Sequence, residues 1–282
     1  MTAFSLLLPV YARDDPQQLR RAFESSVQEQ TRRPDEVVLV QDGPVPDALA
    51  VAIAALVEAS PVPVRHLVLP VNVGLAEALT AGLDACAHDV VARMDADDVA
   101  LPGRFEAQLA VIEQGYDLVG AGLLEFVDDE QVTVGRRTPP IGEEVIQRYA
   151  RFHDPFNHPT VVYRRSAVRR AGGYQAGALM EDYWLFARML QAGARVANLP
   201  EPLVKYRVGA GAYARRGGLR QLRAELHLQR QLHHLGFTTL AQYLRNVLVR
   251  GGYRLLPESV RRTFYRRVLH RDFRDGAAGG VA

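Results

Sequence analysis

The first third of the chain alternates short apolar runs with stretches whose apolar side chains recur every three or four positions. A short apolar run is typical of a buried strand, and the longer period is typical of a helix with one face on a core. The predicted strands are Phe4–Val10, Val37–Val40, Val64–Leu69 and Asp89–Met94, and the predicted helices begin at Asp14–Pro16, Asp47 and Leu75. This strand–helix alternation predicts an α/β fold with a mostly parallel, doubly wound sheet covered by helices.

The pattern is less regular in the rest of the chain. We expect helices over Leu101–Gln114, Gly142–Tyr149 and Glu181–Ala192, and extended segments at Leu118–Val127, Gln131–Val134, His158–Tyr163 and Leu203–Val208. From Leu219 onward the sequence is helical and rich in arginine, with a break at Gly251–Gly252. A C-terminal helical extension is therefore expected after the α/β part.

Polar residues follow each of the four predicted strands. They are Tyr11–Arg13, Asp42, Asn72–Gly74 and Asp95–Asp98. Each group alone is typical of an ordinary loop. Because parallel sheets bind ligands at the carboxyl ends of their strands, the four groups together predict one site along that edge.

The strongest single feature is the sequence Asp95-Ala-Asp97-Asp98 at the end of the fourth predicted strand. In extended chain, Asp95 and Asp97 point to the same side, where their like charges repel unless a cation lies between them. Oxygen ligands of this kind suit Mg2+ or Mn2+, which often share them with a diphosphate. An acidic loop or helix cap before Leu101 and Pro102 is the other interpretation.

A second acidic pair, Glu181-Asp182, opens a predicted helix. Acidic residues in a first helical turn complement the helix dipole, so the pair could serve only as a cap. In a chain that also carries Asp95-Ala-Asp97, a metal-free carboxylate could instead remove the proton from an attacking hydroxyl.

Composition and charge narrow the class of protein. The 282 residues carry 34 basic and 32 acidic side chains, and this near balance argues against a nucleic-acid-binding surface. Cys86 is alone, so no intrachain disulfide is expected. The apolar N-terminal run is too short for a signal peptide, and no segment has the length of a membrane span. A cytoplasmic protein is predicted, and the sequence leaves its oligomeric state open.

Five segments in this order resemble the family 2 glycosyltransferases of GT-A fold. They are Leu8–Tyr11, Val40–Gly43, Asn72–Leu75, Ala92–Asp98 and Glu181–Trp184. The closest likeness is to the non-processive bacterial branch that builds exopolysaccharide and lipopolysaccharide, to which Asn157–Thr160 and Gly172–Tyr174 also conform. The Gln-x-x-Arg-Trp sequence of processive members does not occur, since Trp184 is the only tryptophan.

The resemblance implies a division of the chain. Residues 1–104 would be the nucleotide-sugar-binding half, residues 105–217 the acceptor-binding half of the same GT-A domain, and residues 218–282 a helical tail. It also implies an inverting transfer of one sugar from a nucleoside-diphosphate sugar to a hydroxyl of a glycan or polyprenyl-linked acceptor.

The resemblance assigns roles to individual positions. Pro9, Val10, Tyr11, Arg13, Asp42, Asn72, Gly74 and Asp95 would bind the nucleotide, with Asp42 favouring uracil or thymine. Asp97, with Asp95, would bind Mn2+ or Mg2+ at the diphosphate, and Asp98 is a less certain third member. Asp182 would be the general base, with Glu181 supporting it or contacting the sugar or acceptor.

Several residues keep two interpretations. Contact with the acceptor or the diphosphate is one interpretation of His158, Trp184, Arg207, Arg215 and Arg216. In the other, His158 is a turn histidine, Trp184 is a core residue and the arginines are solvated. The arginines between Arg261 and Arg274 could lie on an anionic membrane as a basic amphipathic helix. The same helix could instead pack on the catalytic domain with a solvated basic face.

Two competing functions share parts of this pattern. A sugar-nucleotide pyrophosphorylase would need a glycine-rich phosphate loop near the N-terminus, and Leu6–Tyr11 has no glycine. A non-catalytic nucleotide-sugar-binding or scaffold subunit would be expected to lack the metal ligand or the base, and both are present here. The enzyme is therefore the preferred interpretation.

Overall fold

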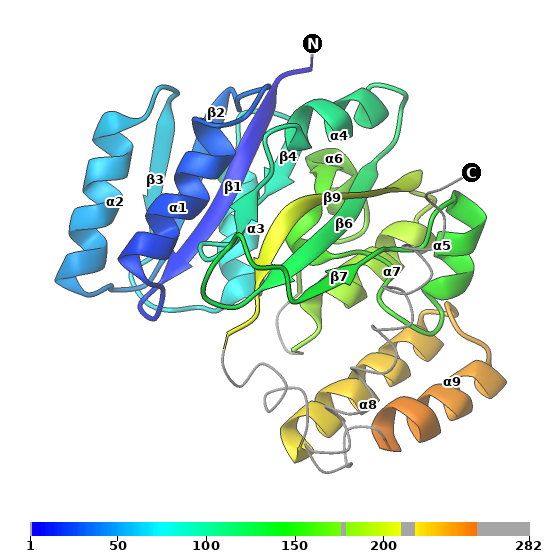
Figure 1. The fold of residues 1–282 in the computed structure, drawn as a ribbon. Helices are drawn as coiled ribbons and strands as arrows, with labels where there is room; N and C mark the ends of the chain where they lie inside the picture. Colours follow the sequence, from blue (N-terminus) through cyan, green and yellow to red (C-terminus); the bar gives the residue numbers. More distant parts are fainter. Residues whose placement is uncertain (1, 176–178, 210–217, 253–282) are drawn as a thin grey trace.

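The computed structural model describes residues 2–175, 179–209 and 218–252 (Figure 1). The N-terminal part is a run of parallel strands in the order β3-β2-β1-β4 with intervening helices. Its strands are β1 (Phe4–Tyr11), β2 (Glu36–Asp42), β3 (Val64–Val68) and β4 (Val90–Arg93), and its helices are α1 (Pro16–Val27), α2 (Asp47–Ala59) and α3 (Leu75–Ala85). The predicted parallel, helix-covered sheet is confirmed.

Local chemistry explains where α1 begins. The Asp15 carboxylate accepts hydrogen bonds from the backbone N–H groups of Gln17 and Gln18, and Pro16 occupies the first helical turn. Both features stabilise a helix start, because the first N–H groups of a helix have no partner within it.

The same sheet continues through the second half of the chain, now with antiparallel neighbours. Strand β8 lies between β4 and β6 and is antiparallel to both, while β6 and β9 run parallel. The remaining strands are β5 (Val99–Ala100), β6 (Leu118–Phe126), β7 (Gly135–Arg137), β8 (Val162–Arg164) and β9 (Val196–Arg207). The helices are α4 (Arg104–Ile112), α5 (Glu143–Tyr149), α6 (Arg165–Arg170) and α7 (Glu181–Gln191). The division at residues 104 and 217 stays a prediction.

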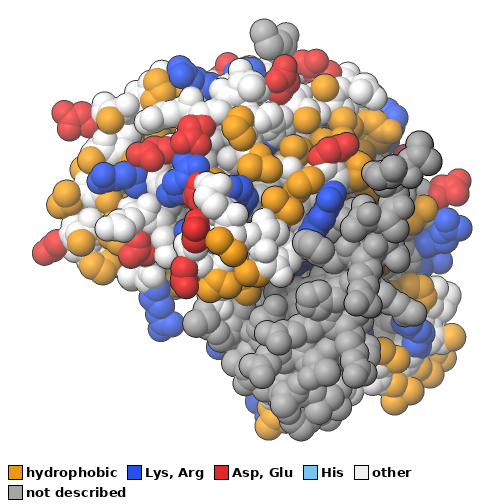
Figure 2. Space-filling model, viewed as in Figure 1, with side chains coloured by type: hydrophobic (Ala, Val, Ile, Leu, Met, Phe, Trp, Pro, Cys, Tyr) orange, Lys and Arg blue, Asp and Glu red, His pale blue; other side chains and the backbone are white. Residues whose placement is uncertain are grey.

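Apolar side chains fill both faces of this sheet. Along β1, Leu6 and Leu8 point to one face and Leu7 to the other, as the two-residue period of a strand requires. Helices α1, α2 and α4 cover the first face, and α3, α5, α6 and α7 cover the second. Burial on both faces leaves the loops at the strand ends as the place for polar chemistry. Acidic and basic side chains are interspersed over the described part of the face in Figure 2.

Two of the predicted extended segments differ in detail from the structure. The segment predicted over Gln131–Val134 is a turn, and the strand β7 follows it at Gly135. The segment predicted from His158 begins instead with a short 3-10 helix, η1 (His158–Thr160), in which Thr160 N–H donates to the Asn157 carbonyl. Pro159 favours this turn because its ring fixes φ near the helical value and removes a donor from the sheet.

The C-terminal helical unit comprises α8 (Leu219–His234), α9 (Leu240–Asn246) and the π-helical turn η3 (Val247–Gly251). Leu228 and Leu232 of α8 pack against Tyr183, Trp184 and Ala187 of α7. The unit thus rests on the helix that carries Asp182, below the sheet in Figure 1. The basic segment around Arg261–Arg274 lies outside the described residues. Within the described ranges, no helix combines the length and apolar character needed to cross a bilayer.

Candidate active site

Two adjoining cavities meet at the carboxyl end of β4, and the first also borders the carboxyl ends of β1 and β2. The first has a volume of about 480 Å³ and the second of about 640 Å³. Arg93, Asp95 and Tyr206 line both, so the cavities meet at these three side chains. The predicted nucleotide-binding residues and the predicted base therefore lie on either side of one shared boundary.

The first cavity gathers most of the residues predicted to bind a nucleotide. Its lining includes Pro9, Val10, Tyr11, Asp14, Asp42, Asn72, Gly74, Arg93, Asp95 and Asp97. Arg13 lies on the exposed turn after β1. The sequence thus identified one connected surface, although contact of each residue with a nucleotide stays a prediction.

Asp42 holds together the loop that forms one wall of this cavity. Its carboxylate accepts hydrogen bonds from Asn72 Nδ2 at 2.9 Å, Val73 N at 2.7 Å and Gly74 N at 3.0 Å. Gly43 lies so close that a Cβ there would be 2.5 Å from Asn72 N, and its φ of +85° favours glycine. Asp42 therefore shapes the pocket by fixing this loop. Its hydrogen bond to a nucleotide base stays a prediction.

The three acidic residues after β4 converge as the sequence predicted. One carboxylate oxygen from each of Asp95, Asp97 and Asp98 lies within 4.8 Å of the other two. Asp98 is fully buried, and its Oδ2 has no hydrogen-bond partner among the described residues. Burial and the neighbouring Asp95 charge raise the pKa of Asp97 to about 6, and the same causes raise the pKa of Asp98 well above its usual value. Such an oxygen-only, mutually repelling set fits a hard divalent cation.

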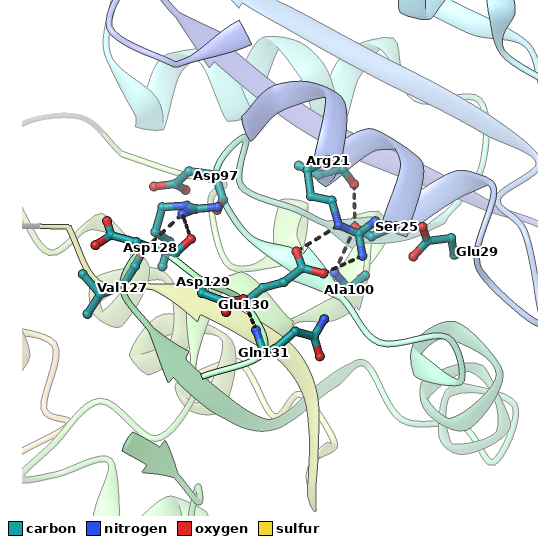
Figure 3. A network of polar contacts seen from close by, with 12 residues as sticks. Arg21, Ser25, Glu29, Asp97, Ala100, Val127, Asp128, Asp129, Glu130 and Gln131 are labelled. Carbon is teal, nitrogen blue, oxygen red and sulfur yellow. Dashed lines mark hydrogen bonds and ion pairs between the residues drawn. The ribbon is translucent and has the colours of Figure 1, made fainter. Parts of the chain in front are cut away.

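Arg207 at the end of β9 anchors the acidic loop. Its backbone N–H donates to Asp98 Oδ1 at 2.9 Å, and its Nε donates to the Asp97 carbonyl at 3.0 Å. Its Nη1 reaches the carbonyls of Val127 and Asp128, and its guanidinium stacks on Phe126. Asp97, Val127 and Asp128 accordingly lie side by side in Figure 3. The structure thus makes Arg207 a support of the loop, and contact with a diphosphate stays a prediction.

The loop after β6 has a second attachment, to α1. The guanidinium of Arg21 donates to both carboxylate oxygens of Glu130, at 2.9 and 3.0 Å (Figure 3). A bidentate pair of this kind fixes orientation as well as distance. Together with Arg207, it holds the 127–131 segment beside the acidic loop.

Asp14 is a fourth carboxylate in the first cavity, and the sequence analysis treated it only as part of a helix start. Asp15 caps α1, which leaves Asp14 to turn toward the site, where its Oδ2 accepts a hydrogen bond from Tyr11 N at 2.9 Å. Burial, with the charges of Asp97 and Asp95, raises the pKa of Asp14 to about 7. The doublet Asp14-Asp15 was the available signal, since one carboxylate suffices for a cap.

Arg93 is the second residue that sequence reasoning missed. It is 2% exposed, forms an ion pair with Asp95 and lines both cavities. Burial alone would lower the pKa of Arg93, but neighbouring groups, Asp95 above all, raise the pKa above its usual value, so Arg93 stays charged. A charged residue inside the apolar run Val90–Met94 was the available signal, because a buried charge needs a partner.

The second cavity contains the predicted base. Asp182 lies in the first turn of α7, where its Oδ1 accepts the Tyr183 N–H at 2.8 Å. Its Oδ2 lies 3.8 Å from His158 Nδ1, and His158 Nε2 is 2.8 Å from the Tyr174 hydroxyl. Burial raises the pKa of Asp182, while burial and the Arg93 charge lower the pKa of His158. A neutral His158 therefore lies beside a carboxylate of increased basicity.

Asp154 was not predicted, yet it lines the same cavity as Asp182 and His158. Burial and the Asp182 charge raise its pKa well above the usual value. Nothing in the sequence around Asp154 marked it, because it meets Asp182 only through the fold. Glu181, next to Asp182, also has a raised pKa through burial and the Asp182 charge.

Trp184 lines neither cavity. Its Nε1 donates to Gln175 Oε1 at 2.8 Å, Arg188 lies over its ring, and it packs in the cluster shared with α8. This placement agrees with the core interpretation of Trp184. Arg215 and Arg216 lie outside the described residues, so their predicted roles stay predictions.

Comparison with known proteins agrees with this geometry. The family model for glycosyl transferase family 2 matches residues 5–172. The amylovoran biosynthesis glycosyltransferase AmsE of Erwinia amylovora is 39% identical over 93% of this chain and 97% of its own length. The UDP-Gal:alpha-D-GlcNAc-diphosphoundecaprenol beta-1,3-galactosyltransferase of Escherichia coli is 31% identical over 95% of this chain and 97% of its own length.

Among solved structures, the fold is similar to the mannosyltransferase PcManGT of Pyrobaculum calidifontis, determined with GDP-Man and Mn2+. The TM-score is 0.62 at 16% identity, over 99% of this chain and 76% of the other. That likeness identifies the fold as GT-A. The family model covers more than half of the chain, and the two relatives are covered almost completely. The chain therefore belongs to glycosyl transferase family 2, and it is a glycosyltransferase.

Proposed function

We propose that this glycosyltransferase moves one sugar from a UDP-sugar to a hydroxyl of a lipid-linked glycan during synthesis of a cell-surface polysaccharide. The relative from Erwinia amylovora, which acts in amylovoran biosynthesis, supports the pathway, and the Escherichia coli relative, which acts on a diphosphoundecaprenol-linked sugar, supports the acceptor class. The observation that carries the proposal is the pair of adjoining cavities, the first beside a cluster of carboxylates and the second lined by Asp182. The reaction would take place at the cytoplasmic side of the membrane that holds the acceptor.

The first cavity is the proposed donor site. Asp95, Asp97 and Asp98 would hold Mn2+ or Mg2+, and the cation would neutralise the nucleoside diphosphate as it leaves. Arg93, charged and buried at the junction of the cavities, is placed to contact the departing phosphate or the transferred sugar. Pro9, Val10 and Tyr11 at the end of β1 would line the base and ribose.

The second cavity is the proposed acceptor site. Asp182 would remove the proton from the acceptor hydroxyl while that oxygen attacks the anomeric carbon from the face opposite the diphosphate. The new bond joins the acceptor oxygen to the anomeric carbon, the bond to the diphosphate breaks, and the configuration inverts. The raised pKa of Asp182 suits this role, because a base works best when its pKa approaches the operating pH.

A donor screen followed by a transfer assay tests the proposal. Thermal shift with UDP-, dTDP- and GDP-sugars, each with Mn2+ and with EDTA, should single out a UDP-sugar that stabilises the protein only with the metal. Release of UDP should then increase when a sugar linked through a diphosphate to a short lipid is added. The anomeric configuration of the product, read by NMR, should be opposite to that of the donor. Binding without UDP release, or a retained configuration, would contradict the proposal.

A further inference from the structure

The C-terminal helical unit (residues 219–251) encloses a row of buried polar side chains. Glu225, Gln229 and Asn246 are each 0% exposed. Gln229 Nε2 donates to Glu225 Oε1 at 3.0 Å, and Asn246 Nδ2 donates to Gln229 Oε1 at 2.9 Å. An apolar contact between α8 and α9 would stabilise the unit at least as well, because burying polar groups costs desolvation free energy. The stability of the helix pair therefore does not by itself explain why this row is polar.

Two side chains of the helical unit, Asn246 and Arg250, donate hydrogen bonds to the backbone next to the acceptor cavity. Asn246 Nδ2 donates to the Arg151 carbonyl at 2.8 Å, and Arg250 Nη1 donates to the Phe152 carbonyl at 2.8 Å. Asp154 follows two residues later and lines the cavity with Asp182. The C-terminal unit thus holds two consecutive carbonyls directly before the lining residues His153 and Asp154.

Arg250 connects the row to His153, which lines the cavity, and to Tyr183, the neighbour of Asp182. Its Nε donates to Glu225 Oε1 at 2.6 Å, its Nη1 lies 3.4 Å from His153 Nδ1, and its guanidinium lies 5.7 Å from the ring centre of Tyr183. Tyr183 follows Asp182 directly, and Arg250 itself lines the cavity. Because the ion pair with Glu225 fixes the guanidinium, its planar shape can orient the other contacts.

A local distortion after α9 places Arg250 at the acceptor cavity. Val247–Gly251 form a π-helical turn, an irregularity that is frequent at functional sites. Gly251 is buried against Leu222, and a Cβ on it would lie 3.4 Å from Leu222 Cδ1. This close approach brings the end of α9 and the turn against α8.

We propose that the C-terminal helical unit is part of the acceptor site, and that Arg250 positions the cavity wall that carries Asp154. Arg250 acts through the Phe152 carbonyl and His153, so it is a positioning residue. Asp154 lines the same cavity as Asp182, where it can form a hydrogen bond with a second hydroxyl of the same sugar. The inference rests on the proposed function, because it assigns the second cavity to the acceptor.

Three variants of the full chain separate positioning from simple stabilisation. Arg250→Ala removes the positive charge that faces the buried Glu225, and such a loss can unfold a protein. Glu225→Gln combined with Arg250→Met removes both charges and keeps the volume. Arg250→Lys keeps the ion pair but lacks the fork that also reaches Phe152 and His153. Arg230→Ala is the matched control, since Arg230 is an exposed arginine of α8 that bonds to His234 of the same helix.

Transfer kinetics give the main readout. For Arg250→Lys and the double variant we expect melting temperatures near that of the wild type and an unchanged KM for the UDP-sugar. The kcat/KM for a sugar-diphosphate-lipid acceptor should fall ~10- to 100-fold, the size expected when a supporting contact misplaces a reacting group. Arg230→Ala should match the wild type in every parameter. Full transfer by Arg250→Lys, or an equal loss of donor and acceptor affinity, would overturn the inference.

Amide hydrogen exchange provides a readout that needs no turnover. In the folded variants, exchange should become faster at the amides of residues 152–157 and stay unchanged in β1. Unchanged exchange in residues 152–157 would overturn the inference. A wild-type protein that transfers to no acceptor would refute the proposed function instead, and the exchange result would still decide whether Arg250 holds this wall.

Discussion

Asp97 and Asp182 lie on opposite sides of the boundary formed by Arg93, Asp95 and Tyr206, and this separation gives them different chemistry. Asp97 belongs to a cluster of carboxylates whose repulsion a cation can relieve. Asp182 has a neutral histidine and a backbone N–H beside it, so it is free to take up a proton. Single substitutions can therefore test the proposed roles of Asp97 in donor binding and of Asp182 in proton transfer.

Replacing Asp97 with asparagine should abolish metal-dependent donor binding. The amide keeps the shape of the side chain but loses the charge that binds a hard cation. We expect the affinity for UDP-sugar with Mn2+, measured by calorimetry, to fall by at least ~10-fold. Asp128→Asn is the matched control, because Asp128 is an exposed carboxylate close to Asp97 (Figure 3). Unaltered donor affinity in Asp97→Asn would remove Asp97 from the metal site.

Replacing Asp182 with asparagine should leave donor binding intact and slow transfer. General-base assistance is typically worth ~100- to 10,000-fold in rate, and we expect a loss in that range. The measurement is UDP release with acceptor at saturating donor, alongside the donor dissociation constant. Glu181→Gln, one residue away, should show a smaller loss. Transfer at the wild-type rate by Asp182→Asn would exclude it as the base.

At the scale of single elements, the acidic loop depends on a strand that follows it by more than a hundred residues. Arg207 lies at the end of β9 and bonds to Asp97, Asp98 and the segment after β6. Without these bonds, the carboxylates of the acidic loop would move apart, because their charges repel. The position of the proposed metal ligands thus depends on β6 and β9 as much as on β4.

Substituting Arg207 should loosen the acidic loop without unfolding the protein. Because the guanidinium bridges several carbonyls, Arg207→Lys should fail to restore what Arg207→Ala loses. We expect Mn2+ affinity to fall ~10- to 100-fold while the melting temperature in EDTA changes little. Arg195→Ala is a suitable control, since Arg195 also stacks on an aromatic ring, that of Tyr116, and bonds to loop carbonyls. Metal affinity equal to that of the wild type would contradict the supporting role.

At the scale of the whole molecule, the active site reduces the stability of the fold. Burial raises the pKa of Asp14 to about 7 and that of Asp97 to about 6, both above the usual value of 3.8. The folded state therefore binds more protons than the unfolded state between about pH 4 and pH 7. The contribution of Asp14 and Asp97 to the free energy of unfolding is therefore fully present at low pH. It is lost as the pH rises through their pKa values in the folded state.

Stability against pH should accordingly depend on the metal. In EDTA, the free energy of unfolding measured with urea should decrease between pH 5 and pH 8, and Mn2+ should recover more of it at pH 8 than at pH 5. The double variant Asp14→Asn, Asp97→Asn should show a flatter profile in EDTA and little response to Mn2+. Parallel profiles for the two proteins in EDTA would refute the link between this cluster and stability.

The parallel half of the sheet and its helices followed from the sequence because their signals are local. The period of Phe4–Val10 and the Asp15–Pro16 cap depend only on neighbouring residues. The segment from His158 was mistaken for strand because Pro159 and the Asn157 carbonyl favour a 3-10 turn that apolar periodicity does not reveal. Asp14, Arg93 and Asp154 escaped notice because partners distant in sequence give them their role.

By itself, the sequence determined the α/β class and the family, and it named Asp95, Asp97 and Asp182 as candidates for chemistry. Hydrophobic period, capping residues and short acidic motifs are read along the chain, so no fold is needed to find them. Only the tertiary structure decided that the two cavities meet at Arg93, that Arg207 bonds to the acidic loop and that Arg250 lines the second cavity. The physical reason is that burial, charge neighbours and hydrogen-bond partners arise from contacts across the sheet, which no local pattern encodes.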